Sequence, residues 1–173
     1  MGGKKQAKYK GNKAMIFMRN ILCIVFSIVI LLGCNKNEER TAIENLLIGE
    51  WKLVSFVNEL DGTSINEEDF DFIINFSRSI IINFKEDYSI DGNTTTNDLF
   101  GTYTLNNSET VLIFLTFGSN TEVGESDWGW LFLEKLQLNY NSQTQHIESD
   151  FEVSGDVLKL YYSNVEFMRF LRL

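Results

Sequence analysis

Hydrophobic and polar residues alternate in short runs along most of the chain after position 45. In the run from Trp51 to Val57, the odd positions share one face of an extended segment and the even positions share the other. This two-residue period predicts β-strands. By the same criterion the predicted strands are 51–57, 79–84, 88–90, 99–105, 111–117, 128–140, 145–153, 157–162 and 165–173. The chain is therefore expected to be all-β, with about eight to nine strands and no helix longer than two turns.

Turn residues separate most of these runs, as Asp61-Gly62, Asp91-Gly92 and Ser163-Asn164 illustrate. Before the first strand, 41–48 is expected to form a short helical turn, since Thr41 and Glu44 have the spacing of a capping box. The segment 67–76 fits either a short helix or an irregular strand. Evenly spaced antiparallel strands suit an up-and-down barrel or a sandwich, and a barrel is preferred because it leaves no exposed edges.

The last predicted strand carries one charge on an otherwise apolar face. Val165, Phe167, Arg169, Leu171 and Leu173 share this face by period-two alternation. Arginine is rarely buried without partners. The aromatic side chain of Trp51, on the first strand, is the candidate partner through a cation–π contact. The guanidinium of Arg169 is also expected to cap carbonyl groups of the helical turn.

Several short motifs in this order resemble the lipocalin-like domain of bacterial lipoproteins, within the lipocalin superfamily. They are Gly49 to Ser55, Phe84 to Asp87, Gly101 to Tyr103 and the terminal Arg169. The resemblance covers 45–173 and departs from the family pattern at Tyr88, where a glycine often follows the aspartate, and in the long segment 118–140. It implies an antiparallel lipocalin-like β-barrel closed at one end by Gly49, Trp51 and Arg169.

Such a barrel is expected either to hold a small apolar or amphipathic ligand or to be packed solid. The candidate cavity positions are Leu53, Trp130, Phe132, Leu136, Leu138, Leu158, Leu160 and Phe167. If the interior is solid, the loops 61–78 and 118–127 are the expected contact surface for another envelope protein or a glycan. Both functions are non-enzymatic.

The first 33 residues read as a signal peptide. Six basic residues precede an apolar run from Ile21 to Leu32, which is too short for a spanning helix. The run ends in Leu31-Leu32-Gly33-Cys34, which resembles the lipobox of bacterial lipoproteins. The resemblance implies that Cys34 is acylated and that 34–44 is a lipidated N-terminus and tether. Residues 1–17 are equally explained by an upstream start codon, since Met18 begins a normal signal.

Net charge and the number of histidines exclude several classes of function. Only nine basic residues follow position 34, against 24 acidic ones, which gives that part a net charge of −15. So acidic a surface argues against nucleic acid as a partner. His146 is the only histidine, so neither a multi-histidine metal site nor a catalytic site is expected, and no cofactor is. The expected location is the bacterial cell envelope, most simply the outer membrane, on its periplasmic or its outer face.

Overall fold

The computed structural model describes residues 42–70, 78–120 and 123–173. The predicted signal peptide, Cys34 and most of the predicted tether lie outside these ranges. The elements are α2 (Ala42–Leu47), β1 (Gly49–Asn58), β2 (Ser64–Asn66), the 3-10 turn η1 (Glu67–Asp69), β3 (Ile81–Phe84), β4 (Ser89–Asn93), β5 (Asp98–Leu105), β6 (Val111–Ser119), α3 (Asp127–Gln137), β7 (Tyr140–Asn141), β8 (His146–Ser154), β9 (Val157–Tyr161) and β10 (Glu166–Arg172).

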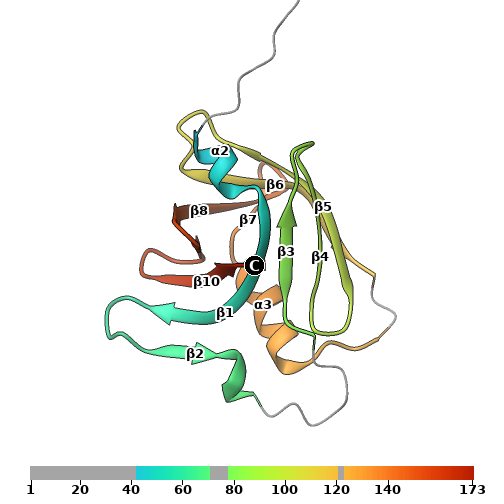
Figure 1. Ribbon diagram of the computed structural model, residues 1–173, viewed down its shortest axis with the longest axis vertical. Helices are drawn as coiled ribbons and strands as arrows, with labels where there is room; N and C mark the ends of the chain where they lie inside the picture. The colour runs from blue at the N-terminus through green and yellow to red at the C-terminus, as the bar shows by residue number, and fades with distance from the viewer. Residues whose placement is uncertain (1–41, 71–77, 121–122) are drawn as a thin grey trace, which may run out of the picture. The chain divides into compact units, whose positions relative to one another are not determined.

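All ten strands belong to one antiparallel sheet that closes on itself. Its order is β1-β3-β4-β5-β6-β8-β9-β10, and β10 then pairs with β1 to complete a barrel of eight strands (Figure 1). The remaining two are additions, because β2 pairs with β1 and β7 pairs with β8. The predicted antiparallel barrel, with a short helical turn at its start, is confirmed.

A β-bulge in β1 changes which side chains point into the barrel. Leu53 pairs with Phe170 and Ser55 pairs with Arg169, so Val54 is an extra residue without a partner on β10. Such an insertion shifts the alternation of the strand by one position. Phe56, predicted on the face opposite Trp51, is consequently buried in the core at 2% exposure.

Tyr88 occupies the turn position where the lipocalin-like pattern usually has glycine. Its φ of 62° is in the left-handed region, which explains why glycine suits this site. The ring of Tyr88 lies 5.7 Å from that of Tyr103, and its hydroxyl donates to Glu44 Oε1 at 3.4 Å. The departure from the pattern therefore gives α2 a contact with the β3–β4 turn.

The segment predicted as a strand over 128–140 is instead a helix over most of its length. Helix α3 has 11 residues, so the prediction that no helix exceeds two turns is also wrong. The Ser126 side chain caps its start by accepting from Gly129 N at 3.1 Å. Its buried side chains Trp128, Phe132 and Leu136 recur every four residues, the spacing of one helix face. Because other hydrophobic residues lie between them, the run also fits a strand.

The ambiguous segment 67–76 begins as the 3-10 turn η1, and 71–77 lies outside the described residues. Within the part of the chain that the structure covers, neither helix combines the length and hydrophobicity needed to cross a membrane.

Candidate functional site: barrel interior and closed end

The closed end of the barrel is built around Trp51. Its indole Nε1 donates to Leu47 O at 2.7 Å, which ties the first strand to the last residue of α2. The guanidinium of Arg172 lies 4.1 Å from the centre of the indole ring, a cation–π distance. Arg172 also donates from Nη1 to Ile48 O at 2.8 Å and from Nη2 to Leu46 O. One side chain thus covers Trp51 and caps one carbonyl group in the last turn of α2 and one just after it.

Gly49 makes room for this arrangement. Its φ is 128°, which L-residues rarely adopt, and a Cβ placed there would lie 2.8 Å from Arg172 Nη1. Gly49 and Trp51 therefore both lie at the closed end, where the resemblance placed them.

The arginine at the closed end is Arg172, whereas the sequence predicted Arg169. On β10 the buried residues Met168 and Phe170 share the inner face with Arg172, whereas Arg169 is exposed on the outer wall. Trp51 is paired with Arg172 in the β1–β10 ladder, which fixes the phase. Each face of the last strand combines apolar residues with one arginine, so alternation alone could not choose between them. The choice depends on the pairing register of β1 and β10, which the sequence does not reveal.

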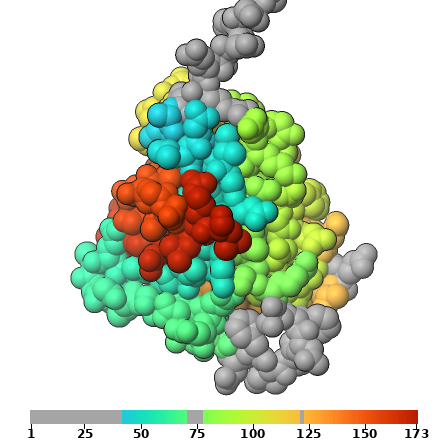
Figure 2. Space-filling model, in the orientation of Figure 1, coloured from blue at the N-terminus to red at the C-terminus, as the bar shows by residue number. Residues whose placement is uncertain are grey.

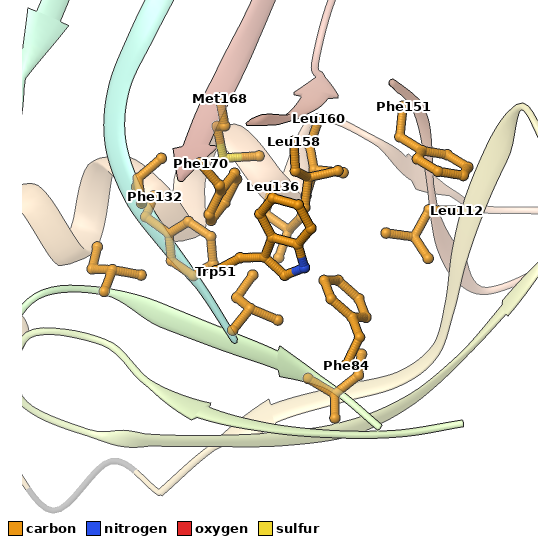
Figure 3. Close-up of a cluster of buried hydrophobic side chains, with 14 of the residues drawn as sticks. Trp51, Phe84, Leu112, Phe132, Leu136, Phe151, Leu158, Leu160, Met168 and Phe170 are labelled. Carbon is orange, nitrogen blue, oxygen red and sulfur yellow. The ribbon is translucent and has the colours of Figure 1, made fainter. Parts of the chain in front are cut away.

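The interior of the barrel is filled by a cluster of hydrophobic side chains. Figure 3 shows Phe132 and Leu136 of α3 beside Trp51, together with strand residues such as Leu158 and Phe170. At the other side of the cluster the Trp128 ring packs edge-on to Phe56, with centroids 4.9 Å apart. The longer helix therefore contributes three large side chains to the space enclosed by the strands.

The predicted cavity positions divide into two groups. Leu53, Phe132, Leu136, Leu158 and Leu160 are in the core, each at most 1% exposed. Trp130 and Leu138 are 60% and 59% exposed, because in a helix they fall on the face opposite Phe132 and Leu136. Phe167 is 5% exposed but lies outside the core cluster, where it packs against Tyr161 and beneath the Lys159 ammonium. Those three residues are not positioned to line a cavity.

A cluster of hydrogen bonds anchors the start of α3 to the β4–β5 turn, and sequence reasoning missed it. The carboxylate of Glu125 accepts from Thr94 Oγ1, from Thr95 Oγ1 at 3.2 Å and from Asn97 Nδ2 at 2.5 Å. These three turn residues are at most 4% exposed. The Thr94-Thr95-Thr96-Asn97 tetrapeptide reads as an ordinary polar turn, and only the fold brings Glu125 to it. The cluster holds the helix in place across the barrel.

The described residues that could bind a metal ion or transfer a proton lie apart from one another or in hydrogen-bonded turns. Among the described residues, no group of three or more histidine, cysteine, aspartate or glutamate side chains is arranged to hold a metal ion. His146 stands at the start of β8, and its Nδ1 is buried without a hydrogen-bond partner in the described structure. The nearby Glu148 carboxylate instead accepts from Thr144 Oγ1 at 2.6 Å and from Asn141 Nδ2 at 3.0 Å. These hydrogen bonds lower the pKa of Glu148, so its side chain is stabilised as a charged carboxylate within the turn.

Neither a protein-family model nor a curated protein sequence matches the chain. Two solved structures share its fold. An NMR structure of a protein from Burkholderia xenovorans aligns with a TM-score of 0.51 and 16% identity, over 81% of this chain and 97% of its own. A crystal structure of a DUF4847-family protein from Bacteroides vulgatus aligns with a TM-score of 0.51 and 14% identity, over 76% of this chain and 96% of its own. At such identities the similarity shows the barrel fold alone.

Proposed function

We propose that this protein is a lipid-anchored, non-enzymatic module of the bacterial cell envelope, whose barrel is a solid scaffold and whose outer surface makes the functional contacts. The observation that carries this proposal is the filling of the barrel by α3. Trp128 and Phe132 are fully buried among strand side chains, and Leu136 is 1% exposed.

An apolar ligand in the barrel would compete with these side chains for the same space. Carriers of drug-sized ligands usually offer a preformed pocket of about 300–1,000 Å³ lined by apolar side chains. Here the inward residues of β1, β9 and β10 pack directly on α3, and Glu125 ties the start of that helix to the β4–β5 turn. Opening the interior would expose this apolar surface and break the hydrogen bonds of Glu125. The geometry therefore favours the solid scaffold over the ligand carrier.

The lipid anchor rests on the sequence Leu31-Leu32-Gly33-Cys34 and the signal peptide before it. Eight residues, from the proposed lipid site at Cys34 to position 41, precede α2. Fully extended, they reach at most about 29 Å, so the barrel would stay near the membrane surface. Two or three acyl chains would hold it there, since each buried methylene contributes about 0.8 kcal/mol.

The solid scaffold is tested by titrating the purified protein with the fluorescent apolar probe 1-N-phenylnaphthylamine and by native mass spectrometry of protein purified gently from its host. We expect no saturable probe fluorescence and the mass of the acylated chain alone. A stoichiometric apolar ligand that leaves only on denaturation would instead establish the carrier.

The anchor is tested separately by Cys34→Ala. We expect this variant to partition into the aqueous phase of a detergent extraction, whereas the parent protein partitions into the detergent phase. Unchanged partitioning would contradict acylation at Cys34 and would leave the question of the barrel interior to the first experiment.

A further inference from the structure

The outer wall of the barrel carries a row of polar residues at the seam where β1 meets β10. In the strand ladders Asn66 is paired with Ser55, Ser55 with Arg169, and Arg169 with Lys159. These four residues thus lie side by side on β2, β1, β10 and β9. Figure 1 shows β2, β1 and β10 next to one another, and their surfaces face the viewer in Figure 2.

A surface hollow of about 290 Å³ lies over this row. Its floor includes Ser55, Asn66 and Arg169; Glu67 and Glu68 of η1 line it, and Val54 and Leu171 add apolar contacts. The β1–β2 hairpin with η1 and the distant strand β10 build it, and the bulge at Val54 lies within it. The hollow is therefore a product of the closed barrel and of the added strand β2.

The Ser55 hydroxyl is an unusual feature of this hollow. Ser55 is only 3% exposed, yet its side chain makes no hydrogen bond with the residues that the structure describes. Its oxygen is nevertheless not one of the fully buried polar atoms that lack a partner, so it is accessible from the hollow that Ser55 lines. A partner supplied by a ligand in the hollow would satisfy it.

Some of the charged side chains around the hollow form ion pairs and others do not. Lys159 Nζ lies 3.1 Å from Glu59 and 3.2 Å from Glu152, and Lys52 Nζ lies 2.8 Å from Glu67. Burial disfavours the charge of Lys159, but hydrogen bonds to Glu59, Tyr161 and Glu152 outweigh it and raise its pKa. Within the described ranges neither Arg169 nor Glu68 forms an ion pair. Among the described residues that line the hollow, Arg169 and Glu68 are therefore the charged side chains without an ion pair.

We propose that this hollow binds a small zwitterion, an amino acid or a short peptide, with its carboxylate on Arg169 and its ammonium group on Glu68. An arginine fork pairs with a carboxylate through two parallel hydrogen bonds. Ser55 lies beside Arg169 and offers its hydroxyl, and Asn66 lies on the other side of Ser55, where its amide Nδ2 also donates to Asp69 Oδ2 at 3.2 Å. A ligand without net charge also avoids repulsion by the strongly acidic protein. The volume, just below the usual range for drug-sized ligands, fits a small molecule.

This inference deepens the proposed function, because it assigns a ligand class to the outer surface, but it requires neither the anchor nor a solid interior. A zwitterion bound outside is compatible with either state of the barrel. The experiments below therefore fail or succeed independently of the apolar probe and of Cys34→Ala.

The test is a titration of the purified full-length protein, followed by changes in its NMR amide spectrum, with three probes. Glycylglycine carries both charges, N-acetyl-glycylglycine only the carboxylate, and glycylglycinamide only the ammonium group. We expect glycylglycine to bind with a Kd on the order of 1 mM and each capped peptide about tenfold more weakly, since each lacks one charged contact. The shifts should map to the amides of Ser55, Asn66 and Arg169.

Arg169→Gln should weaken glycylglycine binding about tenfold or more, and Glu68→Gln should abolish the preference over the acetylated peptide. The matched control is Arg78→Gln, which removes another exposed arginine, one that pairs with Asp98 away from the hollow. It should bind glycylglycine as the parent does. The absence of saturable shifts up to about 10 mM would overturn the proposal, as would equal binding by Arg169→Gln. Because Arg169 is exposed, this variant is expected to fold, and its unperturbed amide spectrum verifies that.

Discussion

Trp51 is the side chain at which three segments of the chain meet. Its backbone pairs with Ile82 of β3 on one side and with Arg172 of β10 on the other. Its indole nitrogen holds the end of α2, and the guanidinium of Arg172 covers its ring. A tryptophan here combines a large buried apolar surface with one polar group that needs a partner, and α2 supplies that partner.

Replacing Arg172 by alanine should destabilise the barrel far more than the same change at Arg169. Arg172→Ala removes a cation–π contact worth about 0.5–2 kcal/mol and leaves two carbonyl groups without their donors, so we expect a loss of about 2–3 kcal/mol. Arg169→Ala changes an exposed outer position and should cost no more than about 0.5 kcal/mol. Urea unfolding measures both. Equal losses would contradict the assignment of the closed end to Arg172.

The phenol of Tyr162 makes the stability of the protein sensitive to alkaline pH. Burial, with a smaller contribution from Glu166, raises the pKa of Tyr162 to about 12 from 10.0. The folded state thus favours the neutral phenol, and the stabilisation is fully present below pH 10 and is lost as the pH rises through 12. We expect the free energy of unfolding of the parent to fall in this window relative to that of Tyr162→Phe. A constant difference between the two proteins would contradict the raised pKa.

At the scale of elements, α3 decides what the barrel encloses. A strand would place Trp130 and Phe132 on the same face, because they are two positions apart. The helix separates them: Trp130 is 60% exposed, and Phe132 is fully buried beside Trp51 (Figure 3). Lys135 of the same helix lies over the Tyr162 ring at 5.3 Å from its centroid, which adds a contact with the end of β9.

Alanine substitutions on α3 should follow the helical face. Phe132→Ala is expected to lower the free energy of unfolding by about 3–5 kcal/mol, as large aromatic deletions in cores do. Trp130→Ala on the exposed face should change it by less than about 0.5 kcal/mol. Urea unfolding of both variants provides the measurement. Large losses in both would mean that the two side chains share a buried face, as in the strand that the sequence predicted.

At the scale of the whole molecule, closure between β1 and β10 gives each of the eight barrel strands a paired neighbour on both sides. A closed barrel cannot lose one strand without breaking two ladders, which favours cooperative unfolding. The three-residue strand β2 has a strand partner on one side only, because in the described structure it pairs with β1 alone.

Hydrogen exchange should reveal this difference. Amides of β10 that bond to β1 or β9 are expected to exchange only through global unfolding, so their protection should equal the free energy measured by urea. Amides of Ser64 and Ile65 in β2 should exchange at least about tenfold faster through local opening. Weak protection across β10 would contradict a closed barrel.

The lipid anchor and its signal peptide remain predictions from Cys34 and the residues before it, which lie outside the described structure. The proposed outer hollow could not have been predicted from sequence, because its residues come from β1, β2, η1 and β10. The same is true of the Glu125 cluster, which joins residues about 30 positions apart.

The sequence alone determined the antiparallel strands and the short helical turn, which follow from local alternation, turn residues and a capping-box spacing that act over a few residues. A barrel was preferred to a sandwich because it leaves no exposed edges, and the resemblance to the lipocalin-like domain placed Gly49 and Trp51 at its closed end. Tertiary structure decided that Arg172 covers Trp51 and that 127–137 is a helix. In both cases the local pattern fits two answers, and the choice depends on strand register and on which side chains the closed barrel can bury.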